Sequence, residues 1–529
     1  MSSTTGSDQV AWLHDAIGYE AYIRSFADSN GDGVGDLEGI RQHLDHLVTL
    51  GVNTLWITPF YPSPMADFGY DVADYCGVDP LFGTLDDVEK LTHDAHALGV
   101  RVLIDLVPNH CSSAHEWFRQ AVSDPAGPYR DYFIWRDPAP NGGPPNNWIS
   151  YFGGSAWSLD EPSGQYYLHL FLDEQPDLNW RCEALRDEFD AILRFWLDLG
   201  IDGFRIDVAQ ALMKDQQLRS NPQVAPWNPN DPLLQQWDAF EHLYDIAQPE
   251  TAAIYRRWRK LVEPRGAVLI GETYVLNADH LARLLSGGGL HLGFWFRPMH
   301  VAWDVTQIRA VLREPLESVD DRRSIGWVQS SHDEVRSPTR FGGGDLGRRR
   351  SLALSTVLFC LPGVPFLYQG EELGLLESVV SAKFRADPVG ADSSLSRDGA
   401  RTPMTWTSGT AFGFSSNAST WLPQDGRTVE DAADYQQVHP DSWLRRYTDL
   451  ITLRREQQDL RGADLEWLDD AAGNVLRFRR GSLVVAVNLG SSPEPAGVDG
   501  EVLFSTGARS GEMRVDSLLN PAEAVVLRR

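Results

Sequence analysis

The sequence of 529 residues predicts an α/β protein: a (β/α)8 TIM barrel with an inserted subdomain after the third strand and a C-terminal antiparallel β domain. Three observations predict this fold. Short β-branched and aromatic runs alternate with helical patterns from residue 16 to about 375, eight such runs can be counted, and the pattern changes after about residue 460. Alternating strands and helices are typical of a parallel sheet with crossover helices, and eight such units close a barrel.

Each of the eight strand candidates is a short run rich in β-branched or aromatic residues, which are common in strands. A helical pattern follows each run, so that one run and its helix form one unit of the barrel. In chain order the candidates are 16–23, 53–60, 101–110, 203–209, 267–274, 292–298, 324–334 and 364–372.

Two stretches are longer than the barrel itself requires. About 100 residues separate the third candidate from the fourth, whereas a βα unit needs only about 30. Residues 111–177, rich in Pro, Gly, Trp and Tyr, are therefore expected to form the inserted subdomain, and a second long loop covers roughly 376–410. Both stretches follow the C-terminal ends of strands, where barrel active sites are built.

The last part of the chain has a different pattern. Short alternating apolar segments such as VLRFRRGSLVVAVNLG are separated by turns, which is typical of antiparallel strands. We therefore assign residues 456–529 to a C-terminal β-sandwich domain. The barrel itself is assigned to residues 1–110 and 178–455.

The charge of the chain restricts its partners. Lys and Arg number 46 and Asp and Glu number 74, so the formal net charge is −28. Such a field repels nucleic acid and anionic membrane surfaces, whereas a neutral small molecule is hardly affected by it. We expect a small-molecule substrate, no nucleic acid and no membrane as partners, and either a monomer or a homo-oligomer.

The first residues and the lack of a long apolar run favour a cytoplasmic protein, and the cysteines are expected to be free. The N-terminus lacks a basic region followed by an apolar one, and no apolar run reaches about 18 residues. None of the four cysteines belongs to a C-x-x-C pair, which argues against zinc and thioredoxin-type chemistry. We expect free, buried thiols at Cys76, Cys111, Cys182 and Cys360.

Charged residues gather at the ends of several strand candidates. A single acidic residue at such a place is often a helix cap, but caps have no reason to collect at one mouth of a barrel. Charged groups are otherwise rare in segments that feed a core. We therefore expect a catalytic cleft built from Asp105, His110, Arg205, Asp207, Glu272, His332 and Asp333.

Within this set, Arg205, Asp207 and Glu272 suggest a division of work. Arg205 and Asp207 are two apart on a strand and so point to the same face. The guanidinium is expected to keep Asp207 ionised, as a nucleophile requires. Nearby carboxylates are expected to raise the pKa of Glu272 and keep it protonated as a general acid. Two carboxyl groups about 5–5.5 Å apart would give a covalent intermediate and net retention.

Five short motifs together resemble the α-amylase superfamily of glycoside hydrolases, over about residues 16–425. They are DLVPNH (105–110), GFRIDVA (203–209), GETY (271–274), SHDE (331–334) and QPDLNW (175–180). The resemblance implies that Asp207 is the nucleophile, Glu272 the acid/base, and Asp333 a third carboxylate that distorts and holds the sugar. It also implies that His110 and His332 bind hydroxyls of the same ring.

One residue departs from the family pattern. The fourth motif usually reads Asn-His-Asp, and this chain has Ser331 in the first position. A serine can still form hydrogen bonds, but its side chain is shorter. The departure puts the fine positioning of Asp333 in question, not the class of reaction.

Two further segments narrow the resemblance to the α-glucosidase branch and similar exo-acting enzymes: GYDVADY (69–75) and ARTPMTW (400–406). There Asp71 and Arg401 correspond to a charged pair that grips the non-reducing end and makes the cleft a pocket. Tyr70 corresponds to an aromatic floor under the sugar. Phe171 is either a further lining residue or an ordinary core residue.

A glycine-rich loop, DSNGDGVGD (28–36), offers oxygen ligands at alternating positions. It resembles the start of a calcium-binding loop, although Gly39 stands where an EF-hand has a bidentate Glu. The alternative is a turn held by Asx hydrogen bonds. We expect one structural Ca2+ or Mg2+ ion, and no cofactor for catalysis, with ligands from Asp28, Asn30, Asp32, Val34 and Asp36.

Three functions can be weighed against the residues. The first is an exo-acting, retaining α-glucosidase that acts on short α-glucosides. The second is a transglucosylase or a sugar isomerase of trehalose-synthase or sucrose-isomerase type, which would use the same covalent intermediate. The third, a non-enzymatic member of the fold, predicts loss of the carboxylates, and all three are present. Val208, which follows the nucleophile, leaves the choice between α-1,4 and α-1,6 linkages open.

Overall fold

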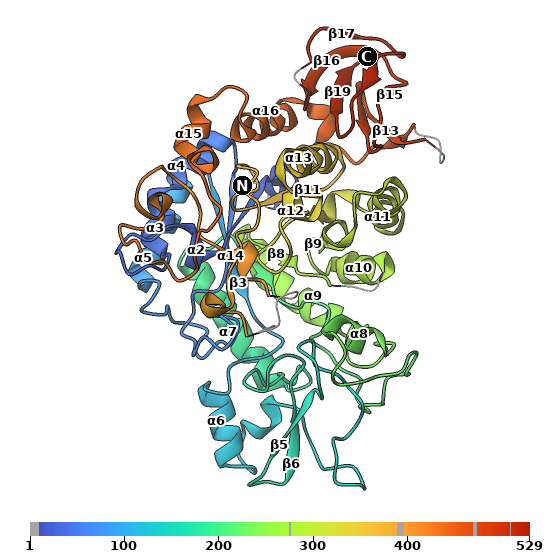
Figure 1. Ribbon diagram of the computed structural model, residues 1–529. Helices are drawn as coiled ribbons and strands as arrows, with labels where there is room; N and C mark the ends of the chain where they lie inside the picture. Colours follow the sequence, from blue (N-terminus) through green and yellow to red (C-terminus); the bar gives the residue numbers. More distant parts are fainter. Residues whose placement is uncertain (1–9, 275–276, 389–395, 469–472, 508) are drawn as a thin grey trace, which may run out of the picture. The chain divides into compact units, whose positions relative to one another are not determined.

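The computed structural model describes residues 10–274, 277–388, 396–468, 473–507 and 509–529. Eight parallel strands close into a barrel in the order β1-β11-β10-β9-β8-β7-β3-β2 (Figure 1). All eight strand candidates are confirmed, and each observed strand lies within its predicted range. The strands are β1 Gly18–Ala21, β2 Thr54–Ile57, β3 Arg101–Leu106, β7 Gly203–Ile206, β8 Val268–Gly271, β9 Leu292–Trp295, β10 Ile325–Trp327 and β11 Val364–Tyr368.

The chain divides into two compact units. The first contains Met1–Thr58, Asp87–Leu103 and Leu292–Arg529, and the second contains Pro59–Asp86 and Ile104–His291. We describe each of them by itself.

In the first unit, β1 is the centre of the strand pairing. Gly18 pairs with Thr54 of β2 and with Phe366 of β11. A Cβ atom at Gly18 would lie 2.1 Å from the Phe366 ring, so only glycine fits there. The helices of this unit are α2 Ile23–Phe26, α3 Leu37–Gln42, α4 Leu44–Leu50, α5 Leu85–Ala97, α11 Val305–Ser318, α12 Ser337–Arg340, α13 Gly344–Cys360, α14 Asp398–Arg401, α15 Ala433–Val438 and α16 Trp443–Glu456.

The C-terminal part of the first unit is antiparallel, as the sequence predicted. One sheet has the order β12-β13-β14-β19-β16-β17, and β15 pairs with β18 in a second sheet. The first sheet lies against α13 and α16 (Figure 1). The strands are β12 Glu466–Trp467, β13 Val475–Arg480, β14 Leu483–Asn488, β15 Glu494–Pro495, β16 Gly500–Ser505, β17 Glu512–Met513, β18 Leu518–Leu519 and β19 Ala524–Arg528.

The second unit holds the insertion. A three-stranded antiparallel sheet of β4 Trp135–Arg136, β6 Gln165–Leu168 and β5 Trp157–Asp160 forms within residues 111–177, together with α6 Glu116–Ser123. The sheet and α6 lie close together (Figure 1). The exact boundaries assigned to the subdomain and to the C-terminal domain stay predictions.

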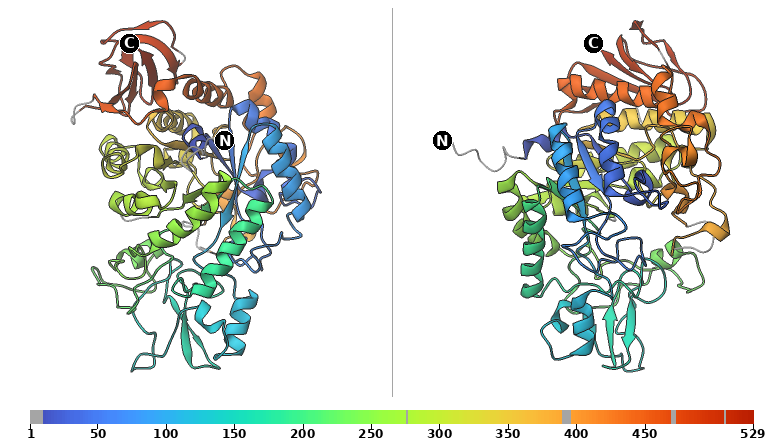
Figure 2. Two further views of the ribbon diagram at one scale, coloured as in Figure 1. Left: turned by 180° about the vertical axis from the view of Figure 1, so that it is seen from behind. Right: turned by 90° about the vertical axis from the view of Figure 1, so that its left-hand side faces the viewer.

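Two long helices of the second unit, α7 Glu183–Asp198 and α9 Thr251–Val262, lie side by side (Figure 2). Helix α7 buries Leu185, Phe189, Ile192 and Trp196, spaced four, three and four residues apart. That spacing gives one apolar face on a helix. The shorter helices of this unit are α8 Leu233–Asp238 and α10 Ala278–Leu285.

Two further expectations can be compared with the structure. The four cysteines are free thiols, as predicted, but only Cys111 and Cys360 are buried, whereas Cys76 and Cys182 are partly exposed. Within the described part of the chain, no helix is both long and apolar enough to span a bilayer.

Candidate active site

In the second unit, Arg205 lies at the centre of a buried group of carboxylates. It is on β7, and its Nη1 donates to Oδ1 of Asp105 at 2.6 Å and to Oδ1 of Asp207 at 2.8 Å. Its Nη2 lies 3.0 Å from Oε2 of Glu272. The four side chains come from the C-terminal parts of β3, β7 and β8 or the residues that follow them, so the structure brings these predicted site residues together.

These groups are withdrawn from water. Arg205 is 2% exposed, Asp207 5% and Glu272 8%. A buried carboxylate without a cation is costly, so the single guanidinium is what makes the cluster tolerable. Its pKa stays well above the ordinary arginine value: burial acts against the charge, but Asp105 and Glu272 outweigh it.

The pKa of Asp207 differs from the expectation. Burial and the neighbouring Glu272 raise the pKa of Asp207 well above its ordinary value, and Arg205 only partly opposes this rise. The two carboxyl groups are also hydrogen-bonded to each other. We expected an ionised Asp207. Burial and Glu272 instead favour its neutral form.

The backbone after the nucleophile takes part in the same cluster. Val208 has φ +46°, a left-handed conformation that is unfavourable for a β-branched residue. In this conformation its N–H donates to Oε2 of Glu272 at 2.8 Å. The Ala209 N–H donates to the Glu272 carbonyl at 2.9 Å. The turn after β7 therefore fixes both ends of Glu272.

His110 and Phe171 lie against each other. Their ring centroids are 4.9 Å apart. Burial lowers the pKa of His110 to about 4, so the ring is neutral at pH 7. Phe171 in turn stacks on Tyr151, which stacks on Trp237 of α8. Phe171 therefore both adjoins a predicted site residue and belongs to an aromatic core.

Lys214 is a buried cation that the sequence analysis missed. Its Nζ lies 2.7 Å from Oδ2 of Asp177 and donates to Oδ1 of Asn109 at 2.7 Å. Asp177 in turn accepts from the Leu170 N–H at 2.9 Å. Lys214 thus ties the turn after β7 to two of the predicted motifs. Only a contact map could have found it, because Lys214 lies outside every motif.

Lys214→Met is expected to destabilise the protein by about 3–5 kcal/mol, because it leaves the fully buried Asp177 without its cation. Urea unfolding would measure this, and adding Asp177→Asn should recover part of the loss. Lys90→Met is the control. Lys90 pairs with Asp87 at the surface, where a pair contributes only about 0–1 kcal/mol. Equal losses for the two lysine variants would contradict the assignment.

Tyr70 and Asp71 are both buried in the second unit. Tyr70 lies beside the acidic cluster, and Asp71 lies within its own loop. The Tyr70 hydroxyl donates to Oδ2 of Asp105 at 3.3 Å. The carboxylate of Asp71 accepts from the Ser63 hydroxyl at 2.8 Å and from the backbone N–H of Asp67 at 3.0 Å. Asp71 therefore orders its own loop. Its predicted grip on a sugar stays a prediction.

In the first unit, Asp333 is surrounded by donors. Nη2 of Arg401 donates to its Oδ1 at 2.6 Å, and Nη1 of Arg397 does so at 3.1 Å. Nε2 of His332 lies 3.0 Å from Oδ2. Burial would raise the pKa of Asp333, but His332 and the two arginines hold it well below the ordinary value. Arg397 was missed, although it stands only four residues before the predicted Arg401.

Ser331, the one departure from the family pattern, has a local task. Its hydroxyl accepts a hydrogen bond from the backbone N–H of Asp333 at 3.2 Å. A short side chain suffices for this turn, because the two residues are two apart. Serine therefore orders the backbone of Asp333, while Arg397 and Arg401 order its carboxylate.

The loop 28–36 is shaped by its own side chains. Asp28 accepts from the N–H groups of Gly31 at 2.7 Å and Gly33 at 2.8 Å, and Asp36 caps α3 by accepting from Gly39 N–H at 2.6 Å. Within the described residues, no group of three or more His, Cys, Asp and Glu is placed to hold a metal ion. The donor set itself, all oxygen, suits a hard cation.

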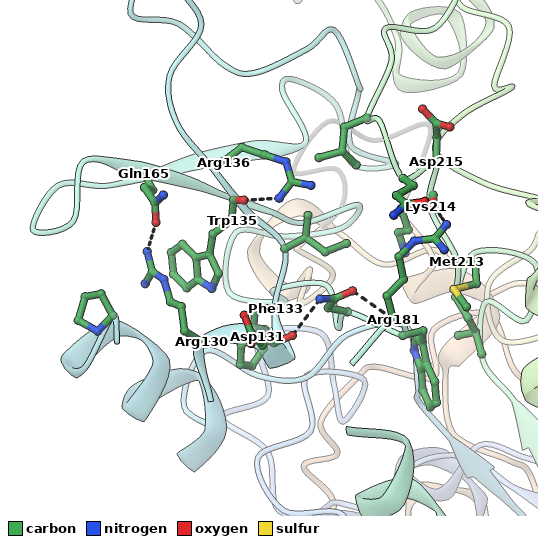
Figure 3. Close-up of a pocket in the computed structure, with 17 residues that line it drawn as sticks. Arg130, Asp131, Phe133, Trp135, Arg136, Gln165, Arg181, Met213, Lys214 and Asp215 are labelled. Carbon is green, nitrogen blue, oxygen red and sulfur yellow. Dashed lines mark hydrogen bonds between the residues drawn. The ribbon is translucent and has the colours of Figure 1, made fainter. Parts of the chain in front are cut away.

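A separate hollow of about 460 Å³ opens in the second unit, between the insertion and the segment after β7 (Figure 3). Its donors are used within the protein: Arg130 bonds to Gln165, and Arg181 to the Lys214 carbonyl. Arg136 donates to the Trp135 carbonyl at 2.7 Å. The hollow therefore lies between two segments that polar side chains hold together.

Known protein families match almost the whole length of this chain. A family model described as "Alpha amylase, catalytic domain" matches residues 20–463, and a domain of unknown function, DUF3459, matches residues 460–527. A probable α-glucosidase of Rhizobium meliloti (strain 1021) is 38% identical over 481 residues, which cover 89% of this chain and 87% of the relative.

Two further similarities are as extensive. An oligo-1,6-glucosidase of Heyndrickxia coagulans is 34% identical, over 84% of this chain and 85% of the relative. The crystal structure of an α-glucosyl transfer enzyme, XgtA, superimposes with a TM-score of 0.87 at 37% identity and covers 98% of this chain and 99% of that one. Together with the match to the catalytic domain, these similarities show that the chain is an enzyme of the α-amylase family of glycoside hydrolases.

Proposed function

We propose that this enzyme is a retaining, exo-acting α-glucosidase that releases α-glucose from the non-reducing end of short α-glucosides. The observation that carries the proposal is the buried pair of Asp207 and Glu272, on neighbouring strands and anchored by Arg205. Two carboxyl groups that flank one glycosidic bond are the minimum machinery for glycoside hydrolysis.

In the first step, a carboxylate oxygen of Asp207 attacks the anomeric carbon, and Glu272 gives its proton to the glycosidic oxygen as that bond breaks. The leaving sugar departs as a neutral alcohol. In the second step, Glu272 takes a proton from water, whose oxygen attacks the same carbon and releases Asp207. Two inversions leave the glucose in the α configuration.

The raised pKa of Asp207 is compatible with this cycle. A glucosyl ring entering between the acids interrupts their hydrogen bond. Arg205, which donates directly to Asp207, then favours the ionised form of the nucleophile, and the proton stays with Glu272. The Val208 N–H holds the Glu272 side chain in place during the change.

Asp333 is proposed as the third carboxylate, which holds and distorts the sugar, with His110 and His332 as partners of its hydroxyls. The parallel, closed barrel supports this role, because barrel enzymes collect catalytic residues at the C-terminal ends of their strands. Arg401 acts through Asp333, to which it donates. Tyr70 and Asp71 are proposed to line the donor site.

A second candidate is transfer of the glucosyl group to a sugar instead of water. The similarity to XgtA, named an α-glucosyl transfer enzyme, favours it specifically. The first half-reaction is identical, so the products must distinguish the two. Maltose, isomaltose, sucrose, trehalose and maltotriose should be assayed side by side at low and high concentration.

Mostly free glucose, released first as the α anomer, supports the α-glucosidase. Mostly isomeric disaccharides or longer products support transfer. Release of β-glucose as the first product contradicts retention and, with it, the roles of both carboxylates. No turnover of any of the five sugars or of a nitrophenyl α-glucoside contradicts the proposed function as a whole.

We also propose one structural Ca2+ or Mg2+ ion in the loop 28–36, held by oxygens of Asp28, Asn30, Asp32 and Asp36 and the Val34 carbonyl. An ion that binds only the folded state stabilises it. Removal with EDTA is therefore expected to lower the Tm, and added calcium to restore it. Asp32→Asn keeps the acceptor for the Val34 N–H but loses one charge, so its Tm should respond less. A wild-type Tm indifferent to EDTA contradicts the ion.

A further inference from the structure

Glu20 is a charged residue in the middle of an otherwise apolar strand, β1. It is 2% exposed, and neither the motifs nor the proposed mechanism uses it. A carboxylate buried in this way is costly unless a partner compensates it. Its partner is His332, whose ring Nδ1 and backbone N–H both face Oε1 of Glu20.

The other ring nitrogen of His332 also faces a carboxylate. Nε2 lies 3.0 Å from Oδ2 of Asp333. A neutral imidazole has one N–H donor and one acceptor, so it can satisfy only one of two carboxylates, and its lone pair would face the other. The imidazolium carries two donors and satisfies both. The geometry alone therefore selects the charged ring.

We propose that Glu20 is a positioning residue that keeps His332 doubly protonated, so that Nε2 donates permanently to Asp333 and holds that carboxylate ionised and oriented. The inference rests on the proposed role of Asp333 as the third carboxylate. It adds Glu20, on the first barrel strand, to His332 and Asp333, which follow the seventh barrel strand, β10.

The charged and titratable groups around His332 decide the balance. Tyr22 stacks on its ring at 5.4 Å and 15°. Arg401 donates to its carbonyl at 2.9 Å, and Arg397 reaches Asp333. The arginines oppose a third positive charge, whereas Glu20 and Asp333 favour it. Burial alone would lower the pKa of His332, but Asp333 and Glu20 outweigh it and raise this pKa to about 9.

Removing the charge of Glu20 should reverse this balance. In Glu20→Gln the amide can still accept one hydrogen bond, from a neutral ring protonated at Nδ1. Nε2 would then present its lone pair to Asp333, which loses a donor and gains repulsion. An opposite charge typically shifts a pKa by about 1–3 units, so the pKa of His332 should fall by that amount.

The direct test is a histidine NMR titration of the full-length protein, with the His332 signal assigned by its absence in His332→Asn. The wild-type signal is expected to stay in the imidazolium form through pH 8. The Glu20→Gln signal is expected to titrate about 1–3 units lower. A neutral His332 at pH 7 in the wild type, or an unchanged titration in Glu20→Gln, overturns the proposal.

Kinetics supply a second readout. For Glu20→Gln, kcat/KM should be least affected at low pH, where His332 is protonated in both proteins, and should fall increasingly below wild type as the pH rises. A purely structural role predicts a loss that is the same at every pH. Glu20→Asp keeps the charge and is expected to recover most of the wild-type pH profile.

Glu372→Gln is the matched control. Glu372 is also fully buried and also bonds to a histidine, His46, whose Nε2 lies 3.0 Å away. Its other partner is the Tyr19 hydroxyl, so this pair is separate from the chain of contacts that runs from Glu20 through His332 to Asp333. Glu372→Gln should lower stability without moving the pH optimum. The proposed function fails separately: an inactive wild type contradicts the α-glucosidase, whereas an active one with an unchanged Glu20→Gln profile contradicts only the role of Glu20.

Discussion

Asp207→Asn is expected to lower the rate of hydrolysis of a nitrophenyl α-glucoside at least about 10⁴-fold, the size of loss that follows removal of a catalytic nucleophile. The amide cannot form the glucosyl ester, so no covalent intermediate accumulates. Steady-state assays with a sensitive fluorogenic α-glucoside would measure the residual rate. A variant as fast as the wild type would show that the nucleophile has been assigned to the wrong residue.

The same substitution should increase stability in a pH-dependent way. The pKa of Asp207 is raised in the folded state above its ordinary value of 3.8, so folding disfavours the ionised carboxyl. The resulting destabilisation is absent below about pH 3.8 and grows as the pH rises. Asn carries no charge. The stability gain of Asp207→Asn should therefore be clear in urea unfolding at pH 7.5 and disappear at pH 3.5.

Chemical rescue distinguishes a missing nucleophile from a damaged fold. In Asp207→Gly, azide can occupy the vacated space, attack the anomeric carbon of an activated α-glucoside and displace its leaving group. One inversion gives a β-glucosyl azide. Formation of the α-azide instead would indicate that another group still provides the first displacement.

Glu272→Gln is the second large effect expected. General acid–base catalysis contributes about 10²–10⁴-fold, so hydrolysis of maltose should fall by that amount. A nitrophenyl leaving group needs little protonation, so the first step with this substrate should be nearly normal and the second step slow. A burst of nitrophenol followed by a slow steady state is the expected signature in a stopped-flow assay.

Azide can also rescue Glu272→Gln, but its product has the opposite anomeric configuration to that from Asp207→Gly. It needs no general base, so it should attack the trapped glucosyl-enzyme of Glu272→Gln and yield the α-glucosyl azide. Gln also keeps an acceptor for the Val208 N–H, which limits structural damage. Equal losses with maltose and with the nitrophenyl substrate, and no burst, would argue that Glu272 does not act as the acid/base.

The barrel could be predicted because its strands carry their own signals. Each strand is a short apolar run at a regular place in a βα repeat, and β7 and β8 end immediately before Asp207 and Glu272. Residues that follow strands of a parallel barrel reach one end of it, so order along the chain predicts proximity. The C-terminal sheet was visible for a similar reason, since its strands alternate.

What could not be predicted depends on contacts between distant segments. Glu20 and His332 are 312 residues apart, and no local pattern links them. Lys214 and Arg397 lie outside the motifs and act through Asp177 and Asp333. The raised pKa of Asp207 likewise depends on its burial and on its separation from Glu272, which strand order cannot give.

The left-handed turn at Val208 has an implication for how such enzymes diversify. The donor that steadies Glu272 is a main-chain group, and a side-chain exchange at 208 leaves that group present. Evolution or an engineer can therefore vary the side chain at this position while the proton-transfer machinery stays intact. The left-handed torsion costs about 1–2 kcal/mol for a non-glycine residue. That cost keeps the main-chain donor in place whichever side chain stands at 208.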